Sequence, residues 1–215
     1  MTRKNNILKI AILLTFILLV ATLLVSTKRN TNNYNHLFED KSIDSCINLL
    51  DCDLAPGDIL IKRQITDRTN FISKLYGLYF THAAMYVGDD NIVEARGKEK
   101  NKSEEIWLTN INNTEWVSNE IESFIVLRVK NSTYSKLKTS IEFIKQIAND
   151  DSYVFGFDND ISQSKEQYCT GLIWKAYNFA DILGDPPNKF ISPDSIVDMA
   201  LKGDSFVISL KKERV

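Results

Sequence analysis

The sequence lacks an excess of charge of either sign, and this absence limits its possible partners. Its 215 residues include 26 lysines and arginines and 28 aspartates and glutamates, which gives a formal net charge of −2. A protein that binds nucleic acid usually carries a basic patch, because it must neutralise phosphates. Internal repeats and low-complexity tracts are also missing. The sequence therefore predicts no nucleic-acid partner, and it predicts one globular domain in the roughly 185 residues that follow an unusual N-terminus.

Histidine and cysteine, the residue types typical of zinc sites, are scarce. The chain has two histidines, His36 and His82, and His36 lies in a polar stretch where we expect it to be solvated. The spacing of Cys46 and Cys52 matches no zinc-binding pattern. The sequence therefore predicts no metal site.

The three cysteines are an odd number, so at least one thiol stays unpaired within the chain. Cys46 belongs to a run of apolar residues with helical spacing, which predicts a helix over residues 42–50. On a helix, positions 46 and 52 lie about 9 Å apart, beyond the roughly 7 Å that a disulfide tolerates. A disulfide between Cys46 and Cys52 therefore requires the helix to end before Cys52.

Residues 7–25 form a long apolar run, interrupted by one lysine and two threonines. A transmembrane helix needs about 20 such residues, so residues 1–27 are predicted to be a single-pass membrane anchor. The basic residues before the run favour a cytoplasmic N-terminus and an extracytoplasmic domain. The alternative is a cleaved signal peptide and a secreted domain, although residues 23–27 show no small-x-small cleavage site. The polar residues 28–41 then form a tether, and residues 42–215 form the domain.

Hydrophobic periodicity predicts strands and helices that are segregated along the chain. Strands are expected at residues 59–61, 83–87, 92–95, 106–109, 124–129 and 206–210, and helices at residues 42–50, 135–148, 170–183 and 193–201. Residues 88–91 form the turn of a β-hairpin. Whether residues 153–157 form a strand or a loop stays open. Because the strands and helices do not alternate, the predicted class is α+β with a mostly antiparallel sheet.

Cys169 stands at the start of the predicted helix 170–183. The unpaired amides and the macrodipole at this end of a helix stabilise negative charge, so they lower the pKa of a cysteine. Because the thiolate is the reactive form, Cys169 is a candidate nucleophile. The alternative is a small apolar residue that begins a buried helix.

His82 and Glu94 lie on the two strands of the predicted hairpin. If residues 88–90 form a three-residue loop, Ala84 faces Glu94, and His82 is diagonal to Glu94 on the same face. Diagonal neighbours are about 7–8 Å apart at the backbone, which the two side chains can span. A two- or four-residue loop would turn Glu94 to the other face, so the loop length decides whether Glu94 can orient the imidazole. The alternatives are a structural histidine and an outward-facing carboxylate.

Three blocks of sequence resemble the NlpC/P60 superfamily of papain-like cysteine hydrolases. Residues 81–95 resemble its histidine hairpin, in which the base and a third polar residue are twelve positions apart, as His82 and Glu94 are. Residues 56–60 resemble the Gly-Asp strand that precedes this hairpin. Residues 168–177 resemble the cysteine helix of the permuted YiiX-like branch, in which the histidine comes before the cysteine.

The resemblance implies a circularly permuted papain-like fold, with an antiparallel sheet or partial barrel packed against helices. It also implies a mechanism in which Cys169 attacks a carbonyl carbon, His82 takes and returns the proton, and Glu94 orients the imidazole. The backbone amide of Cys169 would meet the oxyanion. Tyr153 and Tyr168 are candidates for oxyanion contact or substrate positioning.

This implied mechanism needs no metal or organic cofactor. The expected substrate is an amide of a peptidoglycan peptide, or an ester or amide of a lipid, and the predicted membrane anchor suits either. The branch commonly has Ser-Glu after the cysteine, where this chain has Thr170 and Gly171. The alternative from another class is a catalytically inactive, membrane-anchored module that binds a ligand with the same fold.

Overall fold

The structure is a computed structural model, and it describes residues 34–64, 73, 77–97, 105–118, 121–158 and 160–212. Its strands are β1 (Asp44–Cys46), β2 (Ile59–Gln64), β3 (His82–Gly88), β4 (Asn91–Arg96), β5 (Glu105–Asn110), β6 (Ile121–Val129), β7 (Val154–Phe155), β8 (Glu166–Gln167) and β9 (Phe206–Lys212). Its α-helices are α2 (Asn35–Glu39), α4 (Tyr134–Ala148), α5 (Cys169–Phe179) and α6 (Pro193–Leu201), and its 3₁₀ helices are η1 (Leu49–Asp51), η2 (Ile111–Asn113) and η3 (Glu115–Val117).

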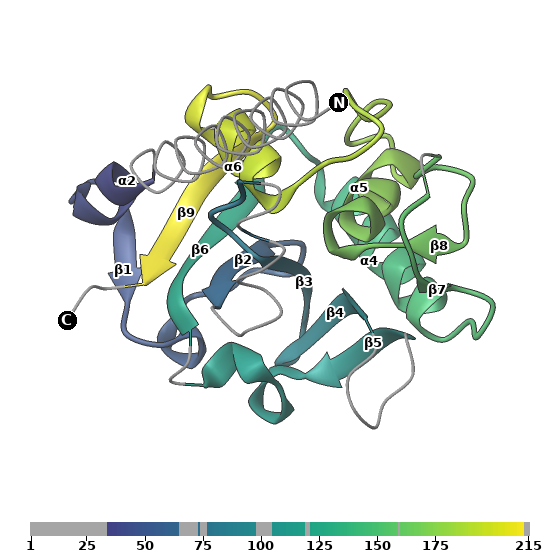
Figure 1. Cartoon of the computed structure of the whole chain (residues 1–215), viewed down its shortest axis with the longest axis horizontal. Helices are drawn as coiled ribbons and strands as arrows, with labels where there is room; N and C mark the ends of the chain where they lie inside the picture. Colours follow the sequence, from purple (N-terminus) through teal and green to yellow (C-terminus); the bar gives the residue numbers. More distant parts are fainter. Residues whose placement is uncertain are drawn as a thin grey trace, which may run out of the picture.

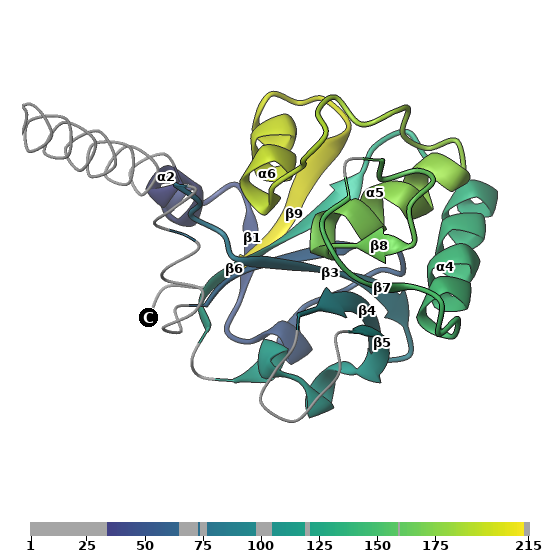
Figure 2. The same cartoon turned by 45° about the vertical axis from the view of Figure 1, so that its right-hand side comes forward.

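The centre of the molecule is a seven-stranded sheet with the order β1-β9-β6-β2-β3-β4-β5. Strands β1 and β9 pair in parallel, and the other neighbours pair antiparallel. Helices α4, α5 and α6 cover one side of this sheet (Figures 1 and 2). The predicted α+β class and mostly antiparallel sheet are confirmed. Among the described residues, no pairing joins the edge strands β1 and β5, so a partial barrel is not confirmed.

Both faces of the sheet are buried at its central strands. In β2, Ile59 and Ile61 belong to a large hydrophobic core that also contains residues of α4, α5 and α6, whereas Leu60 belongs to a second core on the opposite face. This second core includes Trp116 of η3. Strands that are covered on both faces have continuous apolar runs instead of alternating ones, as residues 59–61 do.

The long helices lie close to their predicted positions. Helix α6 has the predicted bounds, and α4 starts one residue before the prediction. Helix α5 ends at Phe179, because Asp181 adopts a left-handed conformation with φ of 51° and the amide of Ile182 bonds back to the carbonyl of Tyr177. The residues that were predicted to complete the helix therefore form a turn. Residues 153–157 contain only the short strand β7, which pairs with β8 in a separate sheet.

The predicted helix over residues 42–50 is wrong. This segment contains β1, which pairs with β9 at the edge of the sheet, and then η1, which is capped by the Asn48 side chain. The sheet pairing supplies backbone hydrogen bonds that local periodicity does not reveal. Since no helix separates them, Cys46 and Cys52 lie 5.5 Å apart at their Cα atoms and form a disulfide.

Part of the predicted tether is folded. Tyr34 and the α2 residues Leu37 and Phe38 are buried in the large core. The ammonium of Lys211 in β9 donates hydrogen bonds to the Leu37 and Phe38 carbonyls, so it satisfies the C-terminal end of α2. The domain core thus includes residues that precede the predicted boundary at residue 42.

The predicted anchor at residues 7–25 lies outside the described residues. Within the described ranges, no helix combines the length and the apolar character that a membrane span requires.

Candidate active site

Cys169 is the first residue of α5 and carries a free, partly buried thiol. Helix α5 is buried along most of its length and packs against β3 and α4. Burial raises the pKa of the Cys169 thiol, but the hydrogen bond and charge of His82 lower it more, with help from the backbone amides of Ala83 and Thr170. The net effect is a lowered pKa. Thus the fold favours the thiolate at this position.

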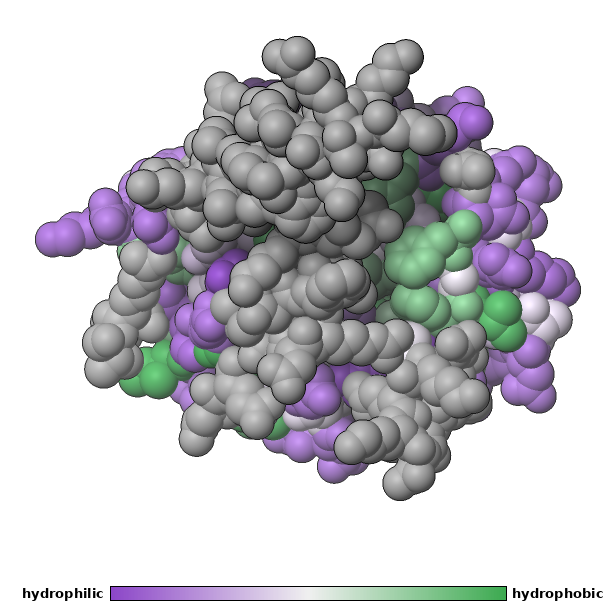
Figure 3. All heavy atoms as spheres, in the orientation of Figure 1, coloured by the Kyte–Doolittle hydropathy of each residue, from purple (hydrophilic) through white to green (hydrophobic). Residues whose placement is uncertain are grey.

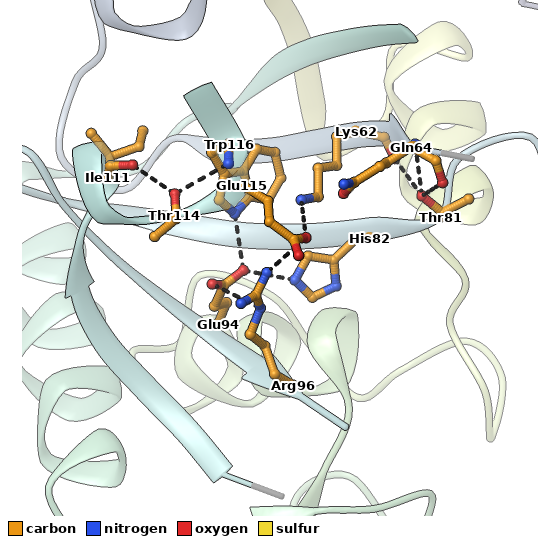
Figure 4. A network of polar contacts seen from close by, with 10 residues as sticks. All are labelled: Lys62, Gln64, Thr81, His82, Glu94, Arg96, Ile111, Thr114, Glu115 and Trp116. Carbon is orange, nitrogen blue, oxygen red and sulfur yellow. Dashed lines mark hydrogen bonds and ion pairs between the residues drawn. The ribbon is translucent and has the colours of Figure 1, made fainter. Parts of the chain in front are cut away.

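His82 begins β3 and stands between Cys169 and Glu94. Its Nε2 atom lies 2.8 Å from Glu94 Oε2 (Figure 4). Because Nε2 contacts the carboxylate, Nδ1 is the ring nitrogen that remains for the hydrogen bond with the Cys169 thiol. Burial lowers the pKa of His82, but the hydrogen bonds to Cys169 and Glu94 raise it above its ordinary value. Both pKa shifts favour an imidazolium beside a thiolate.

The hairpin has the predicted register but not the predicted loop. Gly88 pairs with Asn91, so the loop has two residues, Asp89 and Asp90, and both have positive φ angles of 53° and 56°. Such angles are typical of a type I′ turn. A bulge between Tyr86 and Gly88 adds one residue to β3 and so restores the parity that a two-residue loop would have changed. Met85 lies opposite Val93, and the same register continued by one residue places Ala84 opposite Glu94. The predicted hydrogen bond between Glu94 and His82 is confirmed.

Glu94 is fully buried and is held by two hydrogen-bond donors and one ion pair. Its Oε2 atom accepts hydrogen bonds from His82 and from Trp116 Nε1, the latter at 2.9 Å, and its Oε1 atom lies 3.2 Å from Arg96 Nε. Burial raises the pKa of Glu94, but these partners outweigh burial and lower it to about 2. Glu94 is therefore an anion at neutral pH. The sequence did not indicate Trp116, although a tryptophan within the polar segment 110–118 was a visible signal.

Cys169 and His82 line a cavity of about 340 Å³ with two unlike ends. Its polar lining residues are Lys62, Gln64, Thr81, Arg96 and Glu115, and its aromatic lining residues are Phe155, Phe157, Tyr168 and Phe190. Phe157 and Phe190 are 65% and 44% exposed, so the aromatic end reaches the surface. Figure 3 shows hydrophobic surface on the right of the view, over the region of α5, β7 and β8.

The two candidate tyrosines differ in position. Tyr168 lines the cavity next to Cys169, and its ring stacks on Phe157 at 5.4 Å between centroids. Its hydroxyl accepts a hydrogen bond from the Ile191 amide at 3.0 Å, and burial raises its pKa to about 12. Tyr153 is not among the lining residues, because its ring packs against the ammonium groups of Lys165 and Lys175. Of the two tyrosines, Tyr168 is therefore the one that lines this cavity.

Asp194 is a further contributor that the sequence did not assign. It lies in the first turn of α6, where Ser192 forms the N-cap. Its carboxylate accepts hydrogen bonds from the amides of Tyr79 and Phe80, each at 2.8 Å. Since these residues lead directly into His82, Asp194 fixes the start of β3 to α6. Burial raises the pKa of Asp194 to about 6.

The metal-ligating residue types do not cluster in the described part of the chain. No group of three or more His, Cys, Asp and Glu side chains is arranged there to hold a metal ion.

A cysteine at a helix start, contacted by a histidine from an earlier strand, is typical of a permuted papain-like enzyme. The model of one protein family, described as permuted papain-like amidase enzyme, YaeF/YiiX, C92 family, matches residues 53–196. The chain therefore belongs to this family, and the matched range includes Cys169, His82 and Glu94. No curated protein matches the chain. A crystal structure described as metalloprotein yiiX from Escherichia coli O157:H7 is similar over 74% of this chain and 90% of that chain, with 18% sequence identity and a TM-score of 0.43.

Proposed function

We propose that the protein is a cysteine-dependent hydrolase that cleaves an amide or ester bond in a cell-envelope peptide or a lipid. The observation that supports this proposal most directly is the position of His82 between the Cys169 thiol and the buried Glu94 carboxylate. Membership of a family of papain-like amidases supports the same reaction type.

In the proposed reaction, the Cys169 thiolate attacks the carbonyl carbon of the substrate and forms a carbon–sulfur bond. The oxyanion accepts a hydrogen bond from the Cys169 backbone amide, which has no partner within the helix at this position. Protonated His82 then gives its proton to the leaving nitrogen or oxygen, and the bond to the leaving group breaks. Water attacks the acyl carbon while His82 takes a proton from it, and the carbon–sulfur bond then breaks, so the acid product leaves and the Cys169 thiolate beside protonated His82 is restored.

Glu94 has an orienting role in this proposal. Its hydrogen bond to Nε2 directs Nδ1 toward the thiol, and its charge favours the imidazolium. With the predicted anchor at residues 7–25, the domain would act at the outer side of a cell membrane.

The test is the pH dependence of Cys169 alkylation by iodoacetamide, followed by mass spectrometry. We expect the rate to rise with an inflection below the roughly 8.5 of an ordinary cysteine, because both His82 and the helix start stabilise the thiolate. In His82→Ala the inflection should move to higher pH. His36→Ala is the matched control, since His36 is an exposed histidine away from the cavity.

A Cys169 rate that does not respond to His82 would contradict the proposal. It would favour the alternative, a ligand-binding module in which Cys169 is structural.

A further inference from the structure

Lys62 is a buried cation that the proposed mechanism does not use. Its side chain is 2% exposed and lines the polar end of the cavity. Among the described residues, no group accepts a hydrogen bond from its Nζ atom. The ion pair with Glu115 Oε2 is 3.6 Å long, which exceeds an ordinary hydrogen bond, and the ammonium also lies 4.7 Å from the Trp116 ring centroid. A buried ammonium without an acceptor destabilises the fold, so its presence here requires an explanation.

Lys62 and Arg96 flank His82 on one face of the sheet. Lys62 is the direct cross-strand partner of His82 in the pairing of β2 with β3. The register of β3 with β4, continued from Met85 and Val93, brings Arg96 opposite His82 on the other side. Residues that face each other across antiparallel strands project to the same side. Two cations therefore lie next to the imidazole, one on each neighbouring strand.

The carboxylate of Glu115 already lies between these two cations. Its Oε2 atom accepts a hydrogen bond from Arg96 at 2.9 Å and lies 3.6 Å from Lys62 Nζ (Figure 4). Unlike Glu94, which is fully buried, the Glu115 side chain is 43% exposed. Moving the Glu115 carboxylate into water therefore costs little. Its departure would remove from Lys62 the one carboxylate that the described residues bring within 4 Å of its Nζ atom, while Arg96 would keep its contact with Glu94.

We propose that this end of the cavity is a carboxylate-binding subsite, and that Glu115 occupies in the free protein the place that a carboxylate of the substrate takes. This inference rests on the proposed hydrolase function. The proposal commits to a carboxylate, because a carboxylate, that of Glu115, already contacts both Arg96 and Lys62 at this position.

The position beside His82 identifies which part of the substrate carries this carboxylate. His82 gives its proton to the leaving group, so the leaving group lies on the His82 side of the scissile bond. The acyl part then lies toward Tyr168 and the aromatic end. The substrate class is therefore an amide or ester whose leaving group bears a carboxylate, such as an acylated amino acid or a peptide with a free C-terminal carboxylate.

The test measures how well small ligands protect Cys169 from iodoacetamide in the full chain. The probes are N-benzoylglycine and N-benzoylglycinamide, which differ in the carboxylate, and N-benzoylaminomethylphosphonate as the phosphate-like arm. We expect the carboxylate to protect at a concentration about tenfold lower than the amide, because hydrogen bonds to charged groups contribute more than neutral ones. The phosphonate should protect less well than the carboxylate.

Three variants test which residues are responsible. Lys62→Met should remove most of the advantage of the carboxylate over the amide. Glu115→Gln should increase it, because the competing internal carboxylate is gone. Lys138→Met is the control, since it removes the same charge from an exposed lysine on α4.

A purely structural role for Lys62 would change protection by the acid and by the amide equally. If Lys62→Met does not fold, Glu115→Gln still decides, because unchanged carboxylate protection in that variant overturns the proposal. Equal protection by acid and amide in the wild type, or stronger protection by the phosphonate, also overturns it. In those cases a Cys169 rate that still depends on His82 leaves the hydrolase function standing, whereas a rate that ignores His82 removes that function independently.

Discussion

Replacing Glu94 by glutamine removes the buried anion behind His82 while keeping the size of the side chain. In the folded protein the pKa of Glu94 is about 2, compared with an ordinary value of 4.5. A difference of about 2.5 units corresponds to about 3 kcal/mol of interaction that favours the carboxylate over a neutral group. Since glutamine resembles the neutral acid, Glu94→Gln should lower the free energy of unfolding by about 3 kcal/mol at pH 7.

The sign of the pH dependence follows from the lowered pKa. A carboxyl group whose pKa is lower in the folded state stabilises the fold above its unfolded pKa, and this stabilisation is lost as the pH falls toward the folded pKa. The difference in the free energy of unfolding between wild type and Glu94→Gln should therefore reach its maximum above pH 5 and fall to roughly half of that value by pH 3. Urea unfolding at a series of pH values measures it.

Glu122→Gln is a suitable control for this measurement. Glu122 is 47% exposed and pairs with Arg63 at the surface, so its loss should cost less than about 1 kcal/mol. The pH inflection of Cys169 alkylation supplies a second readout, because His82 loses its anionic partner and should stabilise the thiolate less. A Glu94→Gln variant within about 1 kcal/mol of wild type at pH 7, or a gap that does not shrink in acid, would refute the reasoning.

Two further substitutions test the supports of the site. Because the pKa of Asp194 is raised from 3.8 to about 6, its contribution to stability is full below pH 4 and falls by about 3 kcal/mol as the pH rises through 6. In Asp194→Asn, the unfolding free energy should no longer show this fall between pH 4 and pH 7. A variant whose unfolding free energy changes with pH as steeply as that of the wild type would contradict the raised pKa of Asp194. Gly171→Ala would place a Cβ 2.9 Å from the Tyr168 ring, so thermal unfolding should show a loss of about 1–3 kcal/mol. Gly184→Ala meets no atom within 4 Å and should stay within about 0.5 kcal/mol of wild type.

Local patterns predicted those parts of the fold that local forces determine. Helix α6 has its predicted bounds because proline at the first turn and a serine cap specify its start within the sequence itself. The hairpin register was predicted from parity, and it held although the loop is shorter than assumed, because the bulge after Tyr86 compensates for the missing residue. The pairing of His82 with Glu94 followed from that register.

Tertiary contacts account for most of what the sequence did not reveal. The β1 segment is a strand because β9, over 150 residues later, offers it backbone partners. Trp116 reaches Glu94 from a 3₁₀ helix outside the hairpin, and Asp194 reaches Tyr79 across 115 positions. Neither contact produces a periodic pattern in the sequence from which it could be predicted. Tyr153 was assigned to the site by resemblance, and its ring lies 5.5 Å from the ammonium groups of both Lys165 and Lys175, two contacts that the sequence did not indicate.

The residues after Cys169, where the chain departs from the Ser-Glu pattern, have a structural explanation of their own. The Thr170 hydroxyl donates a hydrogen bond to the Ile191 carbonyl, and the Tyr168 hydroxyl accepts one from the Ile191 amide. The two residues that flank Cys169 thus hold both backbone groups of Ile191. Gly171 leaves the space that the Tyr168 ring occupies, since a side chain there would overlap the ring.

This arrangement extends from the cysteine helix to the histidine strand. Ile191 leads into the turn that places Asp194, and Asp194 in turn fixes the backbone before His82. A larger residue in place of Gly171 would have to displace the Tyr168 ring, and with it the Ile191 contact. None of these contacts involves Glu94, which is held from the other side of His82 by Trp116. Thr170 and Gly171 therefore support the aromatic end of the cavity, whereas the hydrogen bond between Glu94 and His82 does not depend on them.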